Sequence, residues 1–478
     1  MISKNLVVEH LQSLVGAANV LHQALDMQAH LVDWRKRHYG AALCVVFPTS
    51  NADVSQVVKY CNDHHLKVFP QGGNTSVCGG SVPDESTEGS NIILNLGKMN
   101  RIVSVNANDN AMTVQAGCIL AAIHDAAAEA GKIFPLSFGA EGSCQIGGCI
   151  ATNAGGVNVI RFGNTRDLIL GLEVVLADGT VWDGLRTLRK NNSGYDLKNL
   201  FVGSEGTLGI VTGATLKLYP QPTATVTAML AVADVHVAVA QGLRLQQAFP
   251  GALVALEFIS GSEYEIVLKH SKTVKAPFAR TPRCVVLIEL TATTGTSEAL
   301  VESLSECLAA PLEEGVIEDA VLATSEQQRQ DLWLLRHSVT ESNVHEGMGI
   351  THDIAVPIYR IPEFVEQAGQ VLAEQYPQSR PVIVGHMGDG NLHYIAMFSH
   401  GFWRDVADKK AFQHRLSCTL YDIAAGMGGT FSAEHGVGSI HVDEMALYKP
   451  DTELKLMQGI KKLLDPGNIF NPGRVLPN

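Results

Sequence analysis

The sequence predicts an α+β fold with more than one domain. Short apolar runs typical of buried strands alternate with segments of helical periodicity along the chain, and the composition changes near residue 221. A chain of 478 residues is also long enough for about three domains. We therefore expect a domain boundary near residue 221.

The composition is that of a well-packed globular protein, with 46% hydrophobic and 17% charged residues. The 35 basic and 48 acidic residues give a formal charge of −13, which disfavours nucleic acid and anionic membrane surfaces as partners. Because no apolar run reaches 18 residues and no signal core is present, we expect no transmembrane segment and a cytoplasmic location. Nine cysteines without a Cys-x-x-Cys pair disfavour a disulfide framework.

The first part opens with helical periodicity, which predicts a helical segment up to about residue 40. A strand over 44–47, a helix over 54–61 and a strand over 66–69 follow. The second strand runs into Pro70, Gly72, Gly73, Asn74 and Thr75. Paired glycines at this point permit positive φ and close backbone approach.

Two more glycine-rich regions, 134–156 and 201–211, flank a strand, turn and strand over 172–182. Bare amides, hydroxyls and few bulky side chains suit a backbone cradle for a pyrophosphate or a ring system. The alternative is that these glycines only make turns in a β-rich domain. Neither a Gly-x-Gly-x-x-Gly turn at a strand-to-helix junction nor a phosphate-binding P-loop occurs, which disfavours a dinucleotide-binding Rossmann domain and a P-loop NTPase.

From residue 223 onward, strands and helices alternate with the long spacing of an α+β cap. We expect strands over 223–232, 253–258, 284–290 and 350–357, and helices over 235–249, 296–312, 331–340, 407–425 and 444–464. In the helix over 331–340, Arg336 and Thr340 are four residues apart and share a face. A guanidinium beside a hydroxyl suits a carboxylate, and the alternative is a surface arginine.

The stretch 384–393 predicts a β-hairpin that carries a metal site. A two-residue turn at Asp389-Gly390 would make His386 and His393 directly opposed on one face, about 5 Å apart at Cβ. Two histidines with the carboxylate of Glu434 leave coordination positions open, as a catalytic metal needs. If that segment is extended, His435 points to the opposite side, and we interpret it as a base. A lone histidine is more often structural, and this pattern alone names no reaction.

The order of these motifs resembles the FAD-binding fold of the vanillyl-alcohol-oxidase type, also called the PCMH type. The matching stretches span essentially the whole chain: 70–75, 142–148, 151–156, 176–179, 203–209 and 465–474. Within that family the chain is most similar to the D-2-hydroxyglutarate dehydrogenases, with the D-lactate dehydrogenases close behind. The resemblance implies an FAD-binding domain with two subdomains over 1–220 and a substrate-binding α+β cap with an antiparallel sheet over 221–430. It also implies a C-terminal helical segment over 431–478 that completes the active site and returns to the FAD domain.

The resemblance also implies which residues contact FAD. They are Pro70, Gly72, Gly73, Asn74, Thr75, Pro135, Gly139, Gly142, Ser143, Gly147, Gly148, Thr152, Asn153, Gly155, Glu205, Gly209, Ile210 and Asn471. Relatives that link the flavin covalently carry a histidine where this chain has Asn74, so we expect FAD to be non-covalent, with Cys144 as the one alternative attachment point.

Arg336 and Thr340 coincide with substrate-carboxylate positions of the family, and Asn391 would orient the substrate. The 2-hydroxyglutarate enzymes usually carry a lysine where this chain has Thr351. A neutral hydroxyl binds an anion more weakly than an ammonium does, and His352 would compensate only if it were protonated and pointed inward.

The resulting hypothesis is metal-assisted, FAD-dependent oxidation of a D-2-hydroxy acid to the 2-oxo acid. D-2-hydroxyglutarate is favoured, with D-lactate and D-malate as alternatives. The metal is expected to be Zn²⁺, and His435 to contact the substrate and take its hydroxyl proton. An electron-transfer flavoprotein, a quinone or a cytochrome would accept the electrons, and a homodimer is the candidate assembly. Rivals from other classes are a metal-dependent hydrolase and a non-catalytic flavin-binding subunit.

Overall fold

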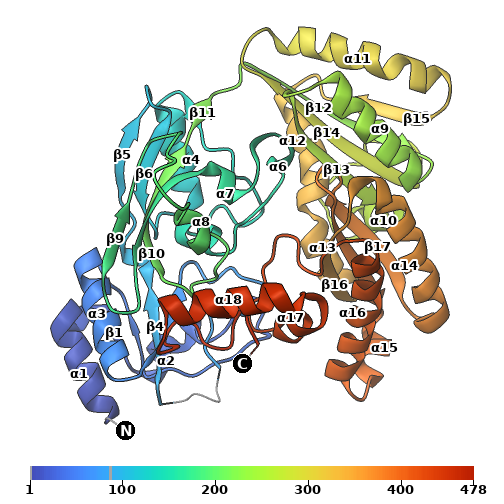
Figure 1. Ribbon diagram of the computed structural model, residues 1–478. Helices are drawn as coiled ribbons and strands as arrows, with labels where there is room; N and C mark the ends of the chain where they lie inside the picture. Colours follow the sequence, from blue (N-terminus) through green and yellow to red (C-terminus); the bar gives the residue numbers. More distant parts are fainter. Residues whose placement is uncertain (1–2, 85–88, 478) are drawn as a thin grey trace. The chain divides into compact units, whose positions relative to one another are not determined.

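The computed structural model describes residues 3–84 and 89–477, and the chain forms two compact units. The first unit contains the chain up to Gly155, Gly163–Gln221 and Glu434–Asn478, and the second contains Gly156–Phe162 and Pro222–Ala433. In Figure 1 the first unit holds the blue elements, the green strands β8, β9 and β10, and the red helices α17 and α18. Helices alternate with mixed and antiparallel sheets, which confirms the α+β class.

The first unit contains two larger sheets and a short strand pair. The four-stranded sheet has the order β1 (Val20–Leu21), β2 (Cys44–Val46), β4 (Asn91–Asn95) and β3 (Lys67–Gln71). The five-stranded sheet has the order β5 (Ile102–Asn106), β6 (Ala111–Gln115), β10 (Ile210–Lys217), β8 (Ile169–Val175) and β9 (Val181–Gly184), and β11 (Tyr219–Pro220) pairs with β7 (Lys132–Ile133).

The helices of this unit connect and cover these strands. They are α1 (Lys4–Val15), α2 (Ala24–Met27), α3 (Asn51–Asp63), α4 (Leu120–Glu129), α5 (Ile146–Ala151), α7 (Thr165–Leu168), α8 (Lys198–Phe201), α17 (Val442–Tyr448) and α18 (Asp451–Leu464). Helix α3 begins at a capping box, in which the Ser50 side chain accepts from the Asp53 N–H and Asp53 accepts in return. The strand–helix–strand prediction for β2, α3 and β3 is therefore confirmed.

The opening segment is not one helix, contrary to the prediction. Helix α1 ends at Val15 because Gly16 adopts φ +90°, a conformation that a helix cannot continue. A 3-10 turn, the short strand β1 and the short helix α2 follow. The apolar spacing continues past Gly16, but the helix ends there because of the backbone conformation of the glycine.

The second unit, which we call the cap, is built on a seven-stranded sheet whose recorded pairs are all antiparallel. The order is β15 (Ile317–Leu322), β12 (Ala224–Val232), β14 (Cys284–Ala292), β13 (Leu253–Ser260), β17 (Arg380–His386), β18 (Asn391–Phe398) and β16 (Met348–Ala355). Its helices are α6 (Val159–Phe162), α9 (Val235–Ala248), α10 (Gly261–His270), α11 (Ser297–Glu313), α12 (Glu326–His337), α13 (Val339–Glu346), α14 (Ile361–Gln375), α15 (His400–Asp405) and α16 (Lys409–Gly426).

Two predicted helices of the chain are interrupted. The helix over 331–340 divides into α12 and α13 at Ser338, whose hydroxyl donates to the Leu334 carbonyl. The C-terminal helix divides into α17 and α18 at Lys449 and Pro450, because proline has no N–H to continue a helix. Among the described residues, no helix has the length and apolar character needed to cross a membrane.

The cap core encloses an acid–amide pair. Glu263 of α10 is fully buried, and its Oε2 accepts a 2.9 Å hydrogen bond from Nδ2 of Asn343 on α13. Glu263 Oε1 and Asn343 Oδ1 have no hydrogen-bond partner among the described residues. Burial raises the pKa of Glu263 to about 7. A protonated Glu263 supplies the donor that Asn343 Oδ1 lacks, so we infer that the acid is neutral in the folded cap at low pH.

This pair makes the stability of the protein pH-dependent. A folded-state pKa raised from 4.5 to about 7 gives stability that is fully present below pH 4.5 and is lost as the pH rises to about 7. The free energy of unfolding should fall by up to about 3 kcal/mol over this range on account of Glu263. Glu263→Gln should flatten this dependence in urea unfolding at pH 5 and pH 8. Glu265→Gln, an exposed change on the same helix, serves as the control, and an unchanged slope in Glu263→Gln would contradict the assignment.

Candidate functional site

The hairpin of β17 and β18 is present, but its turn is longer than predicted. Met387, Gly388, Asp389 and Gly390 form a four-residue turn, so that His386 pairs with Asn391 and His393 pairs with Val384. The prediction of directly opposed histidines was therefore wrong. Met387 is buried, and Asp389 Oδ1 accepts from the Asn391 N–H, which makes a wider turn than Asp-Gly alone would give.

The two histidines nevertheless lie on the same face of the sheet. Asn391 and His393 are two residues apart on β18, and His386 is opposite Asn391, so all three point to one side. The ring centroids of His386 and His393 are 5.6 Å apart. A diagonal pair thus replaces the predicted direct pair.

Each of these histidines has an acidic cross-strand neighbour. Glu257 on β13 pairs with His386, and Asp353 on β16 pairs with His393. The Glu257 Oε1 to His386 Nδ1 distance is 2.6 Å, and the Asp353 Oδ1 to His393 Nδ1 distance is 3.6 Å. A row of polar side chains therefore crosses four adjacent strands of the sheet.

Glu257 joins this row to the helix layer. Its Oε2 accepts a 2.7 Å hydrogen bond from Nε of Arg336 at the end of α12, and Glu257 is 1% exposed. Burial alone would raise the pKa of Glu257, but the charges and hydrogen bonds of His386 and Arg336 lower it below its usual value. Arg336 is thus a partly buried member of a charged network, and the alternative of a surface arginine is wrong.

Asp353 is held by its neighbours at both oxygens. Asn391 Nδ2 donates to Oδ1 at 2.8 Å, and the Ala433 N–H donates to Oδ2 at 3.0 Å. Asn391 Oδ1 is buried without a hydrogen-bond partner among the described residues. Asn391 therefore pairs with His386 across the hairpin and fixes Asp353 through its amide nitrogen.

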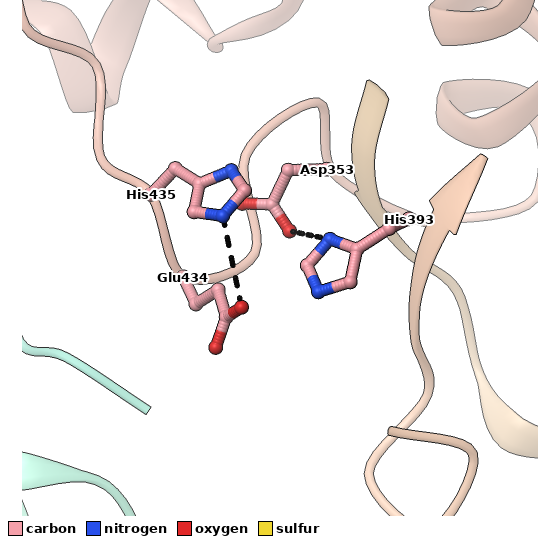
Figure 2. A group of neighbouring side chains, drawn as sticks. All are labelled: Asp353, His393, Glu434 and His435. Carbon is pink, nitrogen blue, oxygen red and sulfur yellow. Dashed lines mark ion pairs between the residues drawn. The ribbon is translucent and has the colours of Figure 1, made fainter. Parts of the chain in front are cut away.

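Four side chains from β16, from β18 and from the segment after α16 come together. One potential ligand atom from each of Asp353, His393, Glu434 and His435 lies within 4.8 Å of the others (Figure 2). His435 Nε2 is 3.7 Å from Glu434 Oε1. The expectation that an extended segment turns His435 away from Glu434 is wrong, because the chain bends after Ala433 and both side chains join the same group.

This group contains two of the three predicted metal ligands, His393 and Glu434, and the predicted base, His435. The third predicted ligand, His386, lies beside it at the ring distance given above. Asp353 was not predicted as a member, although an aspartate in an apolar strand two residues after Thr351 was a visible signal.

The remaining substrate residues fall in different places. Thr351 is exposed on the same strand face as Asp353, and Thr340 is exposed on α13. His352 points to the other face, is fully buried, and contacts the Tyr394 carbonyl and Ser417 Oγ at 3.0 Å each. His352 therefore does not point inward beside Thr351, and the compensation considered for it does not occur.

The glycine-rich regions of the first unit fit an extended ligand. A Cβ added to Gly139, Gly142 or Gly148 would meet no atom within 4 Å, whereas one added to Gly73 would lie 2.1 Å from the Ser143 carbonyl oxygen. The first three glycines thus border open space, and Gly73 lets its segment pack against the segment of Ser143. Gln145 Oε1 is buried there without a hydrogen-bond partner among the described residues. An open backbone cradle with an unpaired polar atom suits a long ligand such as a dinucleotide.

Other residues assigned to FAD by resemblance make contacts within the protein. Asn74 adopts φ +54° and donates from Nδ2 to the Val32 carbonyl at 2.8 Å. Asn471 Nδ2 donates to the Glu205 carbonyl at 2.7 Å, and the Glu205 carboxylate accepts from backbone N–H groups. Ile210 is buried at the start of β10. A role of these residues in FAD binding stays a prediction.

Comparison with known proteins places the chain among flavoproteins. A family model described as the FAD linked oxidases, C-terminal domain, matches residues 221–475, and the FAD binding domain model matches residues 42–184. A mitochondrial D-2-hydroxyglutarate dehydrogenase of Bos taurus is 38% identical over 97% of this chain and 82% of its own. A D-2-hydroxyglutarate dehydrogenase of Xanthomonas citri pv. viticola is 36% identical over 97% of this chain and 96% of its own. The solved structure of p-cresol methylhydroxylase with substrate bound shares the fold, with a TM-score of 0.73 and 18% identity over 98% of this chain and 96% of that one.

Proposed function

The chain belongs to the FAD-linked oxidase family that includes the D-2-hydroxyglutarate dehydrogenases, and we propose that it oxidises a D-2-hydroxy acid to the 2-oxo acid, with D-2-hydroxyglutarate favoured. The observations that carry this proposal are the group of His393, Glu434 and His435 and the Arg336–Glu257–His386 network of the cap. A Lewis-acid site, a base and an anion-binding cation are the groups that alcohol oxidation beside a carboxylate requires.

FAD, when bound, supplies the two-electron acceptor for the hydrogen at the substrate C2. The residues of this chain that would hold it are the backbone groups around Gly73, Gly139, Gly142 and Gly148. We propose that the attachment is non-covalent, since the side chain of Asn74 is bonded to the Val32 carbonyl and offers no nucleophile. Denaturation followed by filtration should release the flavin.

We propose that His386, His393 and Glu434 hold a divalent cation, most suitably Zn²⁺. Nδ1 of His386 lies 2.6 Å from Glu257, and Nδ1 of His393 lies 3.6 Å from Asp353, so the Nε2 atoms would be the metal-binding nitrogens. A carboxylate behind each imidazole is the usual arrangement for metal-ligating histidines, because it fixes the tautomer and the ring orientation. Asp353 is better suited to this supporting role than to ligation, since its oxygens accept from Asn391 and Ala433.

In this scheme Arg336 binds a substrate carboxylate through guanidinium N–H groups other than Nε, which Glu257 already holds. His435 takes the proton of the substrate hydroxyl, and such general base catalysis typically contributes ~10²- to 10⁴-fold in rate. Asn391 keeps Asp353 in place behind His393. The homodimer and the cytoplasmic location stay predictions. The external electron acceptor is also a prediction, with an electron-transfer flavoprotein, a quinone and a cytochrome as candidates.

The decisive experiment mixes the FAD-loaded protein anaerobically with a panel of D- and L-hydroxy acids and follows the flavin absorbance. D-2-hydroxyglutarate should bleach the flavin fastest, ahead of D-malate and D-lactate, and the L-acids should not bleach it. Bleaching by none of these acids would overturn the proposal and favour a non-catalytic flavin-binding subunit. A purified protein that is colourless and binds no FAD would favour a metal-dependent hydrolase.

A change at Thr351 tests substrate preference. Thr351→Lys places an ammonium on the exposed strand face that carries Asp353, so it should improve kcat/KM for D-2-hydroxyglutarate relative to D-lactate by ~10-fold or more, the range of one charge-assisted hydrogen bond. Thr452→Lys, the same substitution at an exposed position of α18, controls for the altered net charge. An unchanged ratio of the two kcat/KM values would show that Thr351 does not face the substrate.

A further inference from the structure

Glu205 is a buried carboxylate that the resemblance assigns to FAD binding and to which the scheme above gives no part in proton transfer. It lies in the turn between α8 and β10, adopts φ +50° and is 9% exposed. Its two oxygens accept hydrogen bonds from consecutive backbone N–H groups, from Val437 to Oε1 at 2.7 Å and from Gly438 to Oε2 at 2.8 Å. The acceptor and both donors belong to the first unit.

The loop that donates these bonds has the form of an anion-binding site. Successive backbone N–H groups after a residue in the left-handed region form a concavity that binds anions, and Gly436 has φ +82°. Here the anion is a side chain of the same chain. The fit is close, because a Cβ on Gly436 would lie 2.8 Å from Glu205 Oε1.

Further contacts hold the rest of this loop. Cys78 Sγ donates to the Gly436 carbonyl at 3.4 Å, and the Ser439 N–H donates to the Cys78 carbonyl at 2.9 Å. The Val475 N–H donates to the Gly438 carbonyl at 3.1 Å. The backbone from Gly436 to Ser439 is therefore anchored at successive positions, and its first residue directly follows His435.

We propose that Glu205 is a positioning residue for His435: by filling the anion site of the 436–438 loop, it fixes the backbone from which the imidazole projects. This inference rests on the proposed function, in which His435 acts as the base. A base must be held within hydrogen-bond reach of the proton that it removes, and a displacement of about 1 Å can cost ~10²-fold in rate.

The chemistry of the loop explains why a carboxylate is needed there. Burial raises the pKa of Glu205, and the N–H groups of Val437 and Gly438 oppose that effect. A glutamine of the same shape would keep one acceptor oxygen but would turn an NH₂ group toward the second N–H. Glu205→Gln therefore changes the loop with little change in packing volume.

The test compares flavin reduction in Glu205→Gln with that of the wild-type holoenzyme, at saturating D-2-hydroxyglutarate. We expect the reduction rate to fall by ~10²-fold, with the FAD content, the metal content and the apparent substrate Kd unchanged. In Glu205→Ala, added formate or acetate should refill the anion site and restore much of the rate, whereas chloride at the same ionic strength should not. Cys78→Ser should keep the rate and Cys78→Ala should lower it, because only serine retains a donor to the Gly436 carbonyl.

Asp53→Ala is the matched control, since Asp53 also accepts from two backbone N–H groups, those of Thr49 and Ser50, but at the start of α3. Its reduction rate should equal that of the wild type. A wild-type rate in Glu205→Gln would overturn the inference, and so would selective loss of FAD, which would make Glu205 a cofactor contact. Failure of the proposed function is distinguishable, because the wild-type flavin would then not bleach with any acid.

Discussion

His393→Ala should abolish metal binding and lower the rate of flavin reduction by about 10³-fold or more. His393 belongs to the four-residue group with Glu434, and it pairs with Asp353 on β16. A bound cation contributes several kcal/mol to the stabilisation of developing negative charge, and each 1.36 kcal/mol corresponds to about tenfold in rate. Metal content by elemental analysis and anaerobic flavin reduction should therefore fall together.

The control for this change is His236→Ala. His236 is an exposed histidine of the same cap, on α9, and its Nε2 contacts Glu366 at 2.7 Å. This variant should keep the metal and the wild-type rate. Added zinc should restore little activity to His393→Ala, because one ligand is missing and not merely displaced. A His393→Ala protein with unchanged metal content would show that the hairpin does not hold the cation.

The fold was largely predictable because its elements carry local signals. The apolar runs of β2, β12 and β14 and the periodicity of α9 and α11 each lie within one stretch of sequence. The errors fall where a single residue ends an element, as at Gly16, Ser338 and Pro450. Periodicity does not register such interruptions, since the apolar spacing continues on the other side.

The candidate site was predictable only in part, because its supporting contacts join residues far apart in sequence. Glu257 and His386 are 129 positions apart, and Glu205 and Val437 are 232 apart. Neither pairing can be read from spacing, since it depends on the order β13–β17–β18–β16 in the cap and on the return of the C-terminal segment to the first unit. Asp-Gly predicted the hairpin correctly but not its register, because burial of Met387 widens the turn.

His435→Ala should lower flavin reduction by ~10²- to 10⁴-fold, the range of general base catalysis, while FAD and metal stay bound. The expectation that the metal stays bound distinguishes two roles of His435, that of a base and that of a metal ligand. His435 lies in the same group as Asp353, His393 and Glu434, with Nε2 3.7 Å from Glu434 Oε1. A residue so placed is near enough to accept a proton from a hydroxyl beside the cation, and near enough to be a ligand itself.

Metal content decides between these roles. A carboxylate at Nδ1 supports a ligating imidazole, and Glu257 lies 2.6 Å from Nδ1 of His386 and Asp353 3.6 Å from Nδ1 of His393. The recorded carboxylate neighbour of His435, Glu434, is itself a proposed ligand. We therefore expect His435→Ala to retain the wild-type metal content and to bind D-2-hydroxyglutarate with little change in Kd, because the cation and Arg336 still hold the acid. Only the transfer of the hydroxyl proton, and with it flavin bleaching, should be slow. Loss of the metal from His435→Ala would make His435 a ligand, and a near-normal bleaching rate would remove it from the base role.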